Sequence, residues 1–167
     1  MSEDDARRKL FSDVVFQKTF VMIKPDAIRE KRIIGKIITR FEDAGLSISN
    51  LKIVMPSSAQ LEKHYSHLSP EILTQICKYI HVPVIIMVLW GSNSVEKVKK
   101  MVGATEPLKA DMGTIRGDFE SESFESAKAS YSFTNMDTAI RNLIHASDSV
   151  ENAKREIEIW FDGVDHV

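Results

Sequence analysis

The segment that decides the fold, residues 141–151, reads RNLIHASDSVE. Its first half is a short apolar run, and Asp148 followed three residues later by Glu151 is typical of a helix start. Apolar residues then recur at helical spacing, at Val150, Ala153, Ile157 and Trp160. The sequence therefore predicts a strand that places His145 near the N-terminal end of a helix spanning about residues 149–160.

His145 has a chemically suggestive position in this arrangement. The unpaired N–H groups and the positive dipole end of a helix favour nearby anions. A histidine at that place can serve as a nucleophile, an acid–base group or a phosphate ligand. It can equally be a half-buried structural residue, and the segment alone leaves both interpretations open.

Length and composition limit the class of protein. A chain of 167 residues suits one domain with a sizeable core. Its 22 Lys and Arg against 24 Asp and Glu give a net charge of −2, which provides no general attraction to nucleic acid or acidic membranes. Cys77 is the only cysteine, so no internal disulfide can form, and we expect a cytoplasmic protein. No run is apolar enough to span a membrane, and residues 1–5 do not resemble a signal peptide.

Hydrophobic periodicity predicts an alternation of strands and helices. A bulge near Asn50 reconciles the two apolar phases of the second strand. Ser69 with Pro70, and Ser94, are expected to begin helices. Residues 104–119 are expected to form a loop, and 120–137 show no clear period. The predicted strands are 19–23, 46–55, 84–90 and 140–145, and the predicted helices are 33–41, 60–65, 70–80, 94–102 and 149–160. This order predicts an α+β sandwich, with helices covering a four-stranded sheet.

Several common nucleotide and metal motifs are absent from the sequence. There is no Gly-x-x-x-x-Gly-Lys-Ser/Thr loop, no Gly-x-Gly-x-x-Gly and no His-Glu-x-x-His. His64 and His67 are three residues apart and can share a helix face, but no further Cys or acidic ligand pattern accompanies them. We therefore expect no protein metal site, and any nucleotide must be bound without the usual phosphate loops.

Four separated motifs resemble those of the nucleoside diphosphate kinases, in the order of that family. They are Lys24-Pro25-Asp26, residues 113–119 (GTIRGDF), residues 142–149 (NLIHASDS) and residues 156–161 (EIEIWF). The resemblance extends over residues 17–161, which leaves 1–16 as an N-terminal extension and 17–167 as a single domain with an unusually long 120–140 segment. It implies the ferredoxin-like βαββαβ fold with a mostly antiparallel sheet.

The resemblance also implies an activity. The terminal phosphoryl group of a nucleoside triphosphate would pass to a nucleoside diphosphate by a ping-pong mechanism through phospho-His145. A neutral imidazole suits this task, because histidine has an ordinary pKa of about 6.5 and so offers a lone pair near pH 7. Mg²⁺ would enter with the nucleotide phosphates rather than in a dedicated protein cage. The expected partners are nucleoside tri- and diphosphates and further copies of the chain, as a hexamer, tetramer or dimer.

Site roles follow from the resemblance residue by residue. Glu156 would orient the His145 ring and fix its tautomer, as the aspartate of a serine protease does. The other matched residues are Lys24 and Asn142 for the ribose hydroxyl and terminal phosphate, Thr105 and Arg116 for the phosphates, Tyr65 near the nucleophile, and Ser147 beside it. Each also has a plain structural interpretation, for example a solvated strand end for Lys24 or an ion pair with Asp118 for Arg116.

The chain departs from the family pattern at several positions. Lys99 stands where the family usually has a phosphate-binding arginine, so the charge is kept but the two-pronged contact is lost. Ile72, with Ile76 one turn later, stands where a phenylalanine usually covers the base. Ala146 replaces the usual glycine after the histidine, and the tail after Phe161 is short, which leaves the assembly size open.

Two other functions compete with the enzyme. A catalytically silent relative that binds nucleotides or partners would usually have lost one of His145, Lys24, Arg116 and Asn142, all of which are present. A nucleic-acid-binding module is disfavoured by the net charge of −2 and by the lack of a basic stripe with aromatic residues.

Overall fold

Four strands form the central sheet of the computed structural model, which describes residues 15–120, 122–123, 125–126 and 141–161. They are β1 (Phe16–Ile23), β2 (Ser47–Val54), β3 (Val84–Ser92) and β4 (Ile144–Ala146). Their order is β2-β3-β1-β4, and every neighbouring pair is antiparallel. This arrangement confirms the predicted α+β fold of ferredoxin-like topology, and the register shift between Ile48 and Asn50 confirms the predicted bulge.

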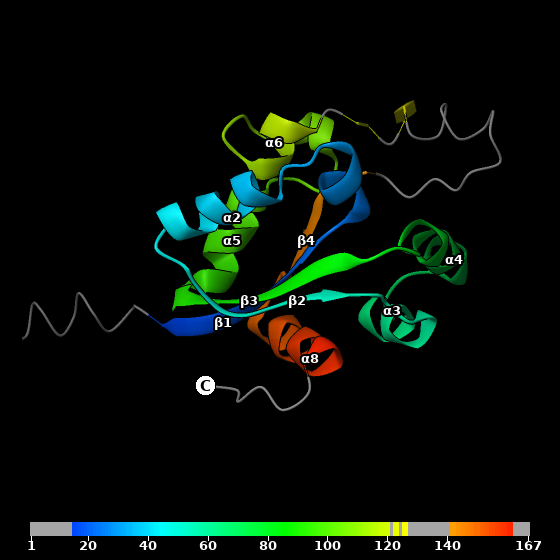
Figure 1. Ribbon diagram of the computed structural model, residues 1–167, viewed down its shortest axis with the longest axis horizontal. Helices are drawn as coiled ribbons and strands as arrows, with labels where there is room; N and C mark the ends of the chain where they lie inside the picture. Colours follow the sequence, from blue (N-terminus) through cyan, green and yellow to red (C-terminus); the bar gives the residue numbers. More distant parts are fainter. Residues whose placement is uncertain (1–14, 121, 124, 127–140, 162–167) are drawn as a thin grey trace, which may run out of the picture.

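Helices cover both faces of the sheet (Figure 1). On one face lie α2 (Ile34–Asp43), α5 (Ser94–Val102) and α6 (Ile115–Phe119); on the other lie α3 (Ser58–His64), α4 (Pro70–Tyr79) and α8 (Val150–Trp160). Two short turns complete the described elements, a π-helical turn η1 (Asp26–Glu30) and a 3-10 turn η2 (Pro107–Lys109). Within the described residues, no helix is long and apolar enough to cross a membrane.

Strands β1 and β3 supply both halves of the core, because alternate residues of a strand point to opposite faces. Val21 and Ile23 of β1 face α2 and α5, where they meet Ile37 and Val98. Phe20 and Met22 face the other side, where the cluster includes Leu61, Ile157 and Trp160. The unbroken apolar run 84–90 predicted a strand buried on both faces; residues 84–89 of β3 are buried in this way, whereas Trp90 is exposed.

Some local predictions were wrong. Ser94 was expected to cap α5, but it is the first residue of the helix, and the residue before the helix is Asn93, with a φ of +48°. The Ser94 hydroxyl donates to the Gln17 carbonyl at 2.8 Å instead of capping the helix. The helix start at residues 148–151 is capped by Ser149, which accepts from the Asn152 backbone N–H at 3.1 Å.

The predicted loop 104–119 contains η2 and α6, the latter capped by the Thr114 hydroxyl. Gly117 is needed in α6, because a Cβ there would lie 2.2 Å from the Asp111 carbonyl oxygen. The last strand begins at Ile144 rather than at 140, because Leu143 has a φ of +66°. Most of the 120–140 segment, residues 1–14 of the N-terminal extension and the tail 162–167 lie outside the described residues.

Candidate active site

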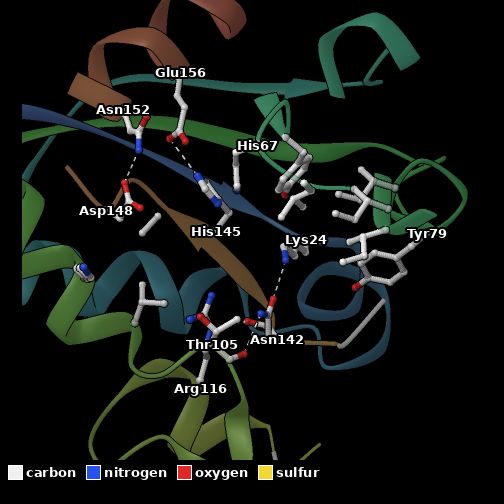
Figure 2. A pocket seen from close by; sticks show the side chains of 18 of the residues that line it. Lys24, His67, Tyr79, Thr105, Arg116, Asn142, His145, Asp148, Asn152 and Glu156 are labelled. Carbon is white, nitrogen blue, oxygen red and sulfur yellow. Dashed lines mark hydrogen bonds and ion pairs between the residues drawn. The ribbon is translucent and has the colours of Figure 1, made fainter. Parts of the chain in front are cut away.

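His145 lies at the centre of β4, opposite Met22 of β1, beside a cavity of about 730 Å³ (Figure 2). Its side chain is 20 % exposed, so it is held by the fold and still reachable. All but one of the site residues predicted from the sequence line this cavity: Lys24, Tyr65, Ile72, Ile76, Lys99, Thr105, Arg116, Asn142, His145 and Glu156. Ser147, the exception, is fully buried behind it. The cavity has the size of a small-molecule site.

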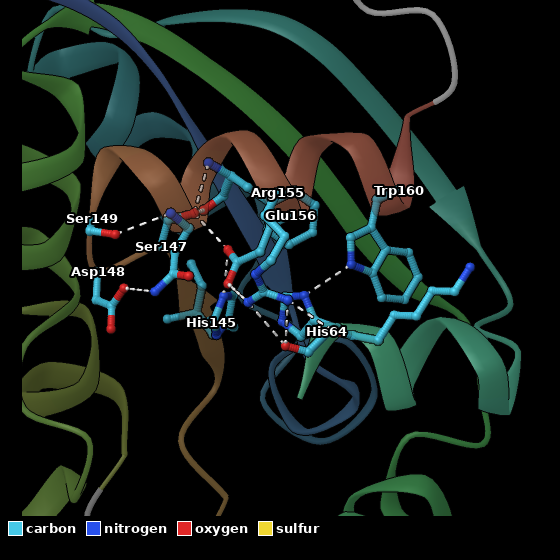
Figure 3. A network of polar contacts seen from close by, with 12 residues as sticks. His64, His145, Ser147, Asp148, Ser149, Arg155, Glu156 and Trp160 are labelled. Carbon is cyan, nitrogen blue, oxygen red and sulfur yellow. Dashed lines mark hydrogen bonds and ion pairs between the residues drawn. The ribbon is translucent and has the colours of Figure 1, made fainter. Parts of the chain in front are cut away.

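Glu156 on α8 contacts the His145 ring (Figure 3). One carboxylate oxygen, Oε2, lies 3.0 Å from His145 Nε2 and accepts the Ser147 hydroxyl proton at 2.6 Å. The other oxygen lies 3.7 Å from the Arg155 guanidinium. Because a carboxylate only accepts hydrogen bonds, Nε2 carries the proton in the neutral ring and Nδ1 carries the lone pair.

A second row of polar groups lies below His145. Lys24, just after β1, donates through Nζ to Asn142 Oδ1 at 2.6 Å, and Asn142 Nδ2 donates to the Thr105 carbonyl at 3.0 Å. Figure 2 shows Lys24, Asn142, Thr105 and Arg116 together on one wall of the cavity. The structure thus joins a half-buried ammonium group and an amide by a direct hydrogen bond.

Arg116 on α6 is 92 % buried and is used largely as a structural clamp. Its Nε, Nη1 and Nη2 atoms donate to the carbonyls of Asn142 at 3.0 Å, Gly103 at 2.9 Å and Ile144 at 2.7 Å, respectively. The alternative interpretation of Arg116, an ion pair with Asp118, does not hold among its described contacts, since Asp118 pairs with Arg40 instead. A guanidinium has five N–H donors, so at most two remain for a ligand.

Burial lowers the proton affinity of both cations. The pKa of Lys24 falls to about 8, because the ammonium group is buried and lies near the charge of Arg116, while Asp26 opposes the shift. Burial also lowers the pKa of Arg116 to about 10, again opposed by Asp26. The cavity wall is therefore a region of concentrated positive charge in a poorly solvated setting, which favours an anionic ligand.

His64 is a member of this site that the sequence analysis did not identify. It is 1 % exposed, and its ring lies 4.4 Å from that of His145, centroid to centroid. Trp160 Nε1 donates to its Nδ1 at 3.1 Å (Figure 3), so the proton of the neutral ring is on Nε2. Burial, and then the charge of His145, hold the pKa of His64 well below its usual range.

The cluster of His64, His145 and Glu156 has the spacing of a metal site, since one ligand atom from each lies within 4.8 Å of the others. However, a metal needs a lone pair on the histidine nitrogen, and the Trp160 bond places a proton on His64 Nε2. His67, which the sequence paired with His64, is exposed rather than buried. The cluster is thus better suited to orienting His145 than to holding a metal.

The remaining cavity walls are apolar or mixed. Ile72 of α4 is 45 % exposed at the rim, and Ile76 follows one turn later. Burial and the nearby Glu156 raise the pKa of Tyr65, whose hydroxyl has no hydrogen-bond partner among the described residues. The sequence analysis also missed several lining residues on α4 and α8, namely Tyr79, Asn152 and Arg155; their helices were predicted, but not which faces meet the cavity.

A partly exposed imidazole bonded to a carboxylate, beside the half-buried Lys24 and the buried Arg116, suits a phosphotransferase, because phosphoryl transfer depends on placement and on positive charge around the phosphate oxygens. The comparisons with known proteins give the family. The family model described as nucleoside diphosphate kinase matches residues 17–165. A nucleoside diphosphate kinase from Methanothermobacter thermautotrophicus is 43 % identical over 148 residues, which cover 87 % of each chain. One from Pyrococcus horikoshii is 44 % identical over 147 residues, 87 % of this chain and 85 % of that one.

Solved structures agree with the sequence comparisons. A transition-state mimic of nucleoside-diphosphate kinase from Borrelia burgdorferi, with bound vanadate and ADP, superposes with a TM-score of 0.79 at 37 % identity, covering 91 % of this chain and 90 % of that one. An NDP kinase from Pyrobaculum aerophilum has a TM-score of 0.75 at 32 % identity, covering 89 % and 97 %. The chain belongs to the nucleoside diphosphate kinase family and is an enzyme that transfers a phosphoryl group between nucleotides.

Proposed function

We propose that the reaction proceeds by a ping-pong mechanism through phospho-His145. The observation that carries this proposal is the 3.0 Å contact between His145 Nε2 and Glu156 Oε2 at a cavity lined by Lys24 and Arg116. The Nδ1 lone pair forms a bond to the γ-phosphorus while the bond from that phosphorus to the β,γ-bridging oxygen breaks, and the nucleoside diphosphate leaves with that oxygen. A second diphosphate then attacks the phosphorus through a terminal oxygen and restores the imidazole.

The same geometry supports roles for the other groups. Lys24 and Asn142 would hold the ribose hydroxyl and the terminal phosphate, and the positive charge of Arg116 and the hydroxyl of Thr105 would accommodate the remaining phosphates. Lys99, exposed at the cavity wall, would add one further contact to the polyphosphate. Ile72 and Ile76 would cover the base with aliphatic surface, which reads no base edge, so base specificity should be broad. Tyr65 and Ser147 would act through their neighbours, Ser147 by its bond to Glu156.

The metal, the assembly and the location extend the proposal. The substrate is taken as the Mg²⁺ complex of the nucleotide, since Mg²⁺ prefers oxygen ligands and is readily supplied with substrate phosphates. A homo-oligomer is supported by the edge strand β2, where Leu51 and Ile53 are 46 % and 70 % exposed. A single cysteine and nucleotide substrates fit the cytoplasm.

The decisive test is labelling with γ-labelled ATP and Mg²⁺. Wild-type protein should acquire an acid-labile, base-stable label that a nucleoside diphosphate removes, and His145→Ala should abolish both labelling and exchange. His81→Ala is the matched control, because His81 is exposed and is not among the residues that line the cavity. Labelling that survives in folded His145→Ala would refute the nucleophile assignment. A wild-type protein that binds nucleotide but never labels would favour a catalytically silent relative.

A further inference from the structure

Asp26 is a buried carboxylate that the proposed mechanism does not use. It is the third residue of Lys24-Pro25-Asp26 and begins η1, and its side chain is completely buried. Its Oδ2 accepts the backbone N–H of Leu143 at 2.8 Å, across 117 residues of sequence. A carboxylate without compensating partners is costly to bury, so its neighbours should explain its place.

Its hydrogen-bond partner belongs to an unusual turn. Leu143 has a φ of +66°, a region that bulky side chains rarely adopt. The Ile144 N–H donates to the Asn142 carbonyl at 2.7 Å, two residues back. Together these features describe a γ-turn with a positive central φ, which is a rare and strained conformation. Such a turn persists only where the surrounding structure holds it.

The turn sets the position of two proposed site residues. Asn142 begins it and reaches Lys24 Nζ, and His145 follows it by one residue. All its carbonyls are held from outside: Lys24 N–H donates to the Leu143 carbonyl at 2.8 Å, and Arg116 donates to those of Asn142 and Ile144. Asp26 holds the central N–H, so the turn is fixed from both sides.

Asp26 is also the negative charge among these cations. Its charge favours the protonated forms of Lys24 and Arg116, two cations of the cavity wall. From α4, the Tyr79 hydroxyl accepts the Asp26 backbone N–H at 3.4 Å, and burial together with the Asp26 charge raises the pKa of Tyr79. Glu122 also lies within the influence of Asp26, and burial is the main cause that raises its pKa.

We propose that Asp26 is a positioning residue of the phosphoryl transfer: it fixes the γ-turn that places Asn142 and His145, and it offsets the positive charge of Lys24 and Arg116 until the nucleotide arrives. The inference rests on the proposed role of His145 as nucleophile. It assigns two separable contributions to one carboxylate, a hydrogen-bond acceptor for the turn and a charge for the cations.

Two substitutions separate these contributions. Asp26→Asn keeps an oxygen that can accept the Leu143 N–H but removes the charge, whereas Asp26→Ala removes both. Asp43→Asn is the matched control, because Asp43 is exposed at the end of α2 and lies away from the cavity. Each full-length protein is first checked by circular dichroism and thermal unfolding. The rate of phospho-His145 formation from Mg²⁺–ATP and the nucleotide Kd are then measured from pH 6.5 to pH 9.5.

The two variants should differ in kind. In Asp26→Asn, the loss of nucleotide affinity at high pH should begin about one pH unit lower than in wild type, because an opposite charge nearby typically shifts a pKa by about 1–3 units. Asp26→Ala should show the same shift and also a fall of at least about tenfold in the saturated rate at every pH, since a misplacement of about 1 Å can cost about a hundredfold.

Some results would contradict the proposed role of Asp26. Wild-type rates and pH profiles in both folded variants would overturn the inference, as would losses of activity that merely follow the fraction of unfolded protein. If Asp26→Ala does not fold, the pH profile of Asp26→Asn alone decides the charge contribution. Absence of label in the wild-type protein would instead refute the role of His145, so the two failures can be told apart.

Discussion

Replacing Glu156 by glutamine isolates the charge that faces His145. The side chain is 3 % exposed, and one oxygen accepts both His145 Nε2–H at 3.0 Å and the Ser147 hydroxyl at 2.6 Å. Glutamine has nearly the same size, and its amide oxygen can take over both bonds. The substitution therefore removes the negative charge while it leaves the packing of α8 against β1 in place.

The expected magnitude follows from the change in hydrogen-bond type. A hydrogen bond to a charged group contributes about 1.5–3 kcal/mol and a neutral one about 0.5–1.5 kcal/mol. Phosphorylation at Nδ1 places positive charge on a ring that keeps its Nε2 proton, so the difference of about 1–1.5 kcal/mol acts on the transition state. Since about 1.4 kcal/mol corresponds to a factor of ten, phospho-His145 should form about tenfold more slowly in Glu156→Gln.

Single-turnover labelling with saturating Mg²⁺–ATP measures this rate directly. Glu151→Gln is the matched control, since it makes the same change on an exposed position of α8 and should label at the wild-type rate. A Glu156→Gln rate within twofold of wild type would refute the electrostatic role of the carboxylate. A loss above about a thousandfold would mean that the amide turns its NH₂ toward Nε2 and puts the ring in the wrong tautomer.

Three further predictions concern the cations. Phosphate binding favours the protonated form of Lys24, whose pKa is about 8. The nucleotide affinity, measured by calorimetry, should therefore be constant near pH 7 and fall above pH 8 by up to about tenfold per pH unit. An affinity that stays constant to pH 9.5 would contradict this. Arg116→Lys should lose two of three carbonyl contacts and about 3 kcal/mol of unfolding free energy in urea, against no change for exposed Arg29→Lys. Lys99→Arg should lower the KM for ATP by about three- to tenfold, because a two-pronged contact strengthens phosphate binding; an effect equal to that of neighbouring Lys100→Arg would exclude a specific contact.

Much of the fold could be predicted because its elements are regular and long. Their apolar periods can be recognised even where a predicted boundary is wrong by one residue. This holds for strands β1, β2 and β3 and for helices α2, α4, α5 and α8. The shorter pieces could not be found this way: α6 has five residues and β4 has three. The false start of the last strand has a physical cause, because the apolar pair Leu143 and Ile144 favours a strand, while the bonds from Asp26, Lys24 and Arg116 impose a turn at residues 142–144.

The site shows the same division between local and tertiary information. His145, Lys24 and Asn142 lie in motifs that could be matched in the sequence, and the structure brings them to one cavity. His64 could not be identified, because its importance comes from packing against His145 and from the Trp160 bond, both across distant segments. Arg116 was identified, but its threefold use as a backbone clamp was not, since no sequence pattern shows how many donors a guanidinium has left.

The clamp and the turn together explain why this cavity suits a polyphosphate. The half-buried Lys24 and the buried Arg116 share one buried carboxylate, Asp26, so the wall has more positive than negative charge in a setting where water screens poorly. Each cation is already fixed by bonds to the protein, through Asn142 or the backbone, and need not reorganise when the ligand binds. Fixed charge of this kind is what stabilises a transferring phosphoryl group most effectively. The negative charge of the nucleotide phosphates thus balances the excess positive charge of the cavity wall. His145 lies beside that wall, where the positive charge is concentrated.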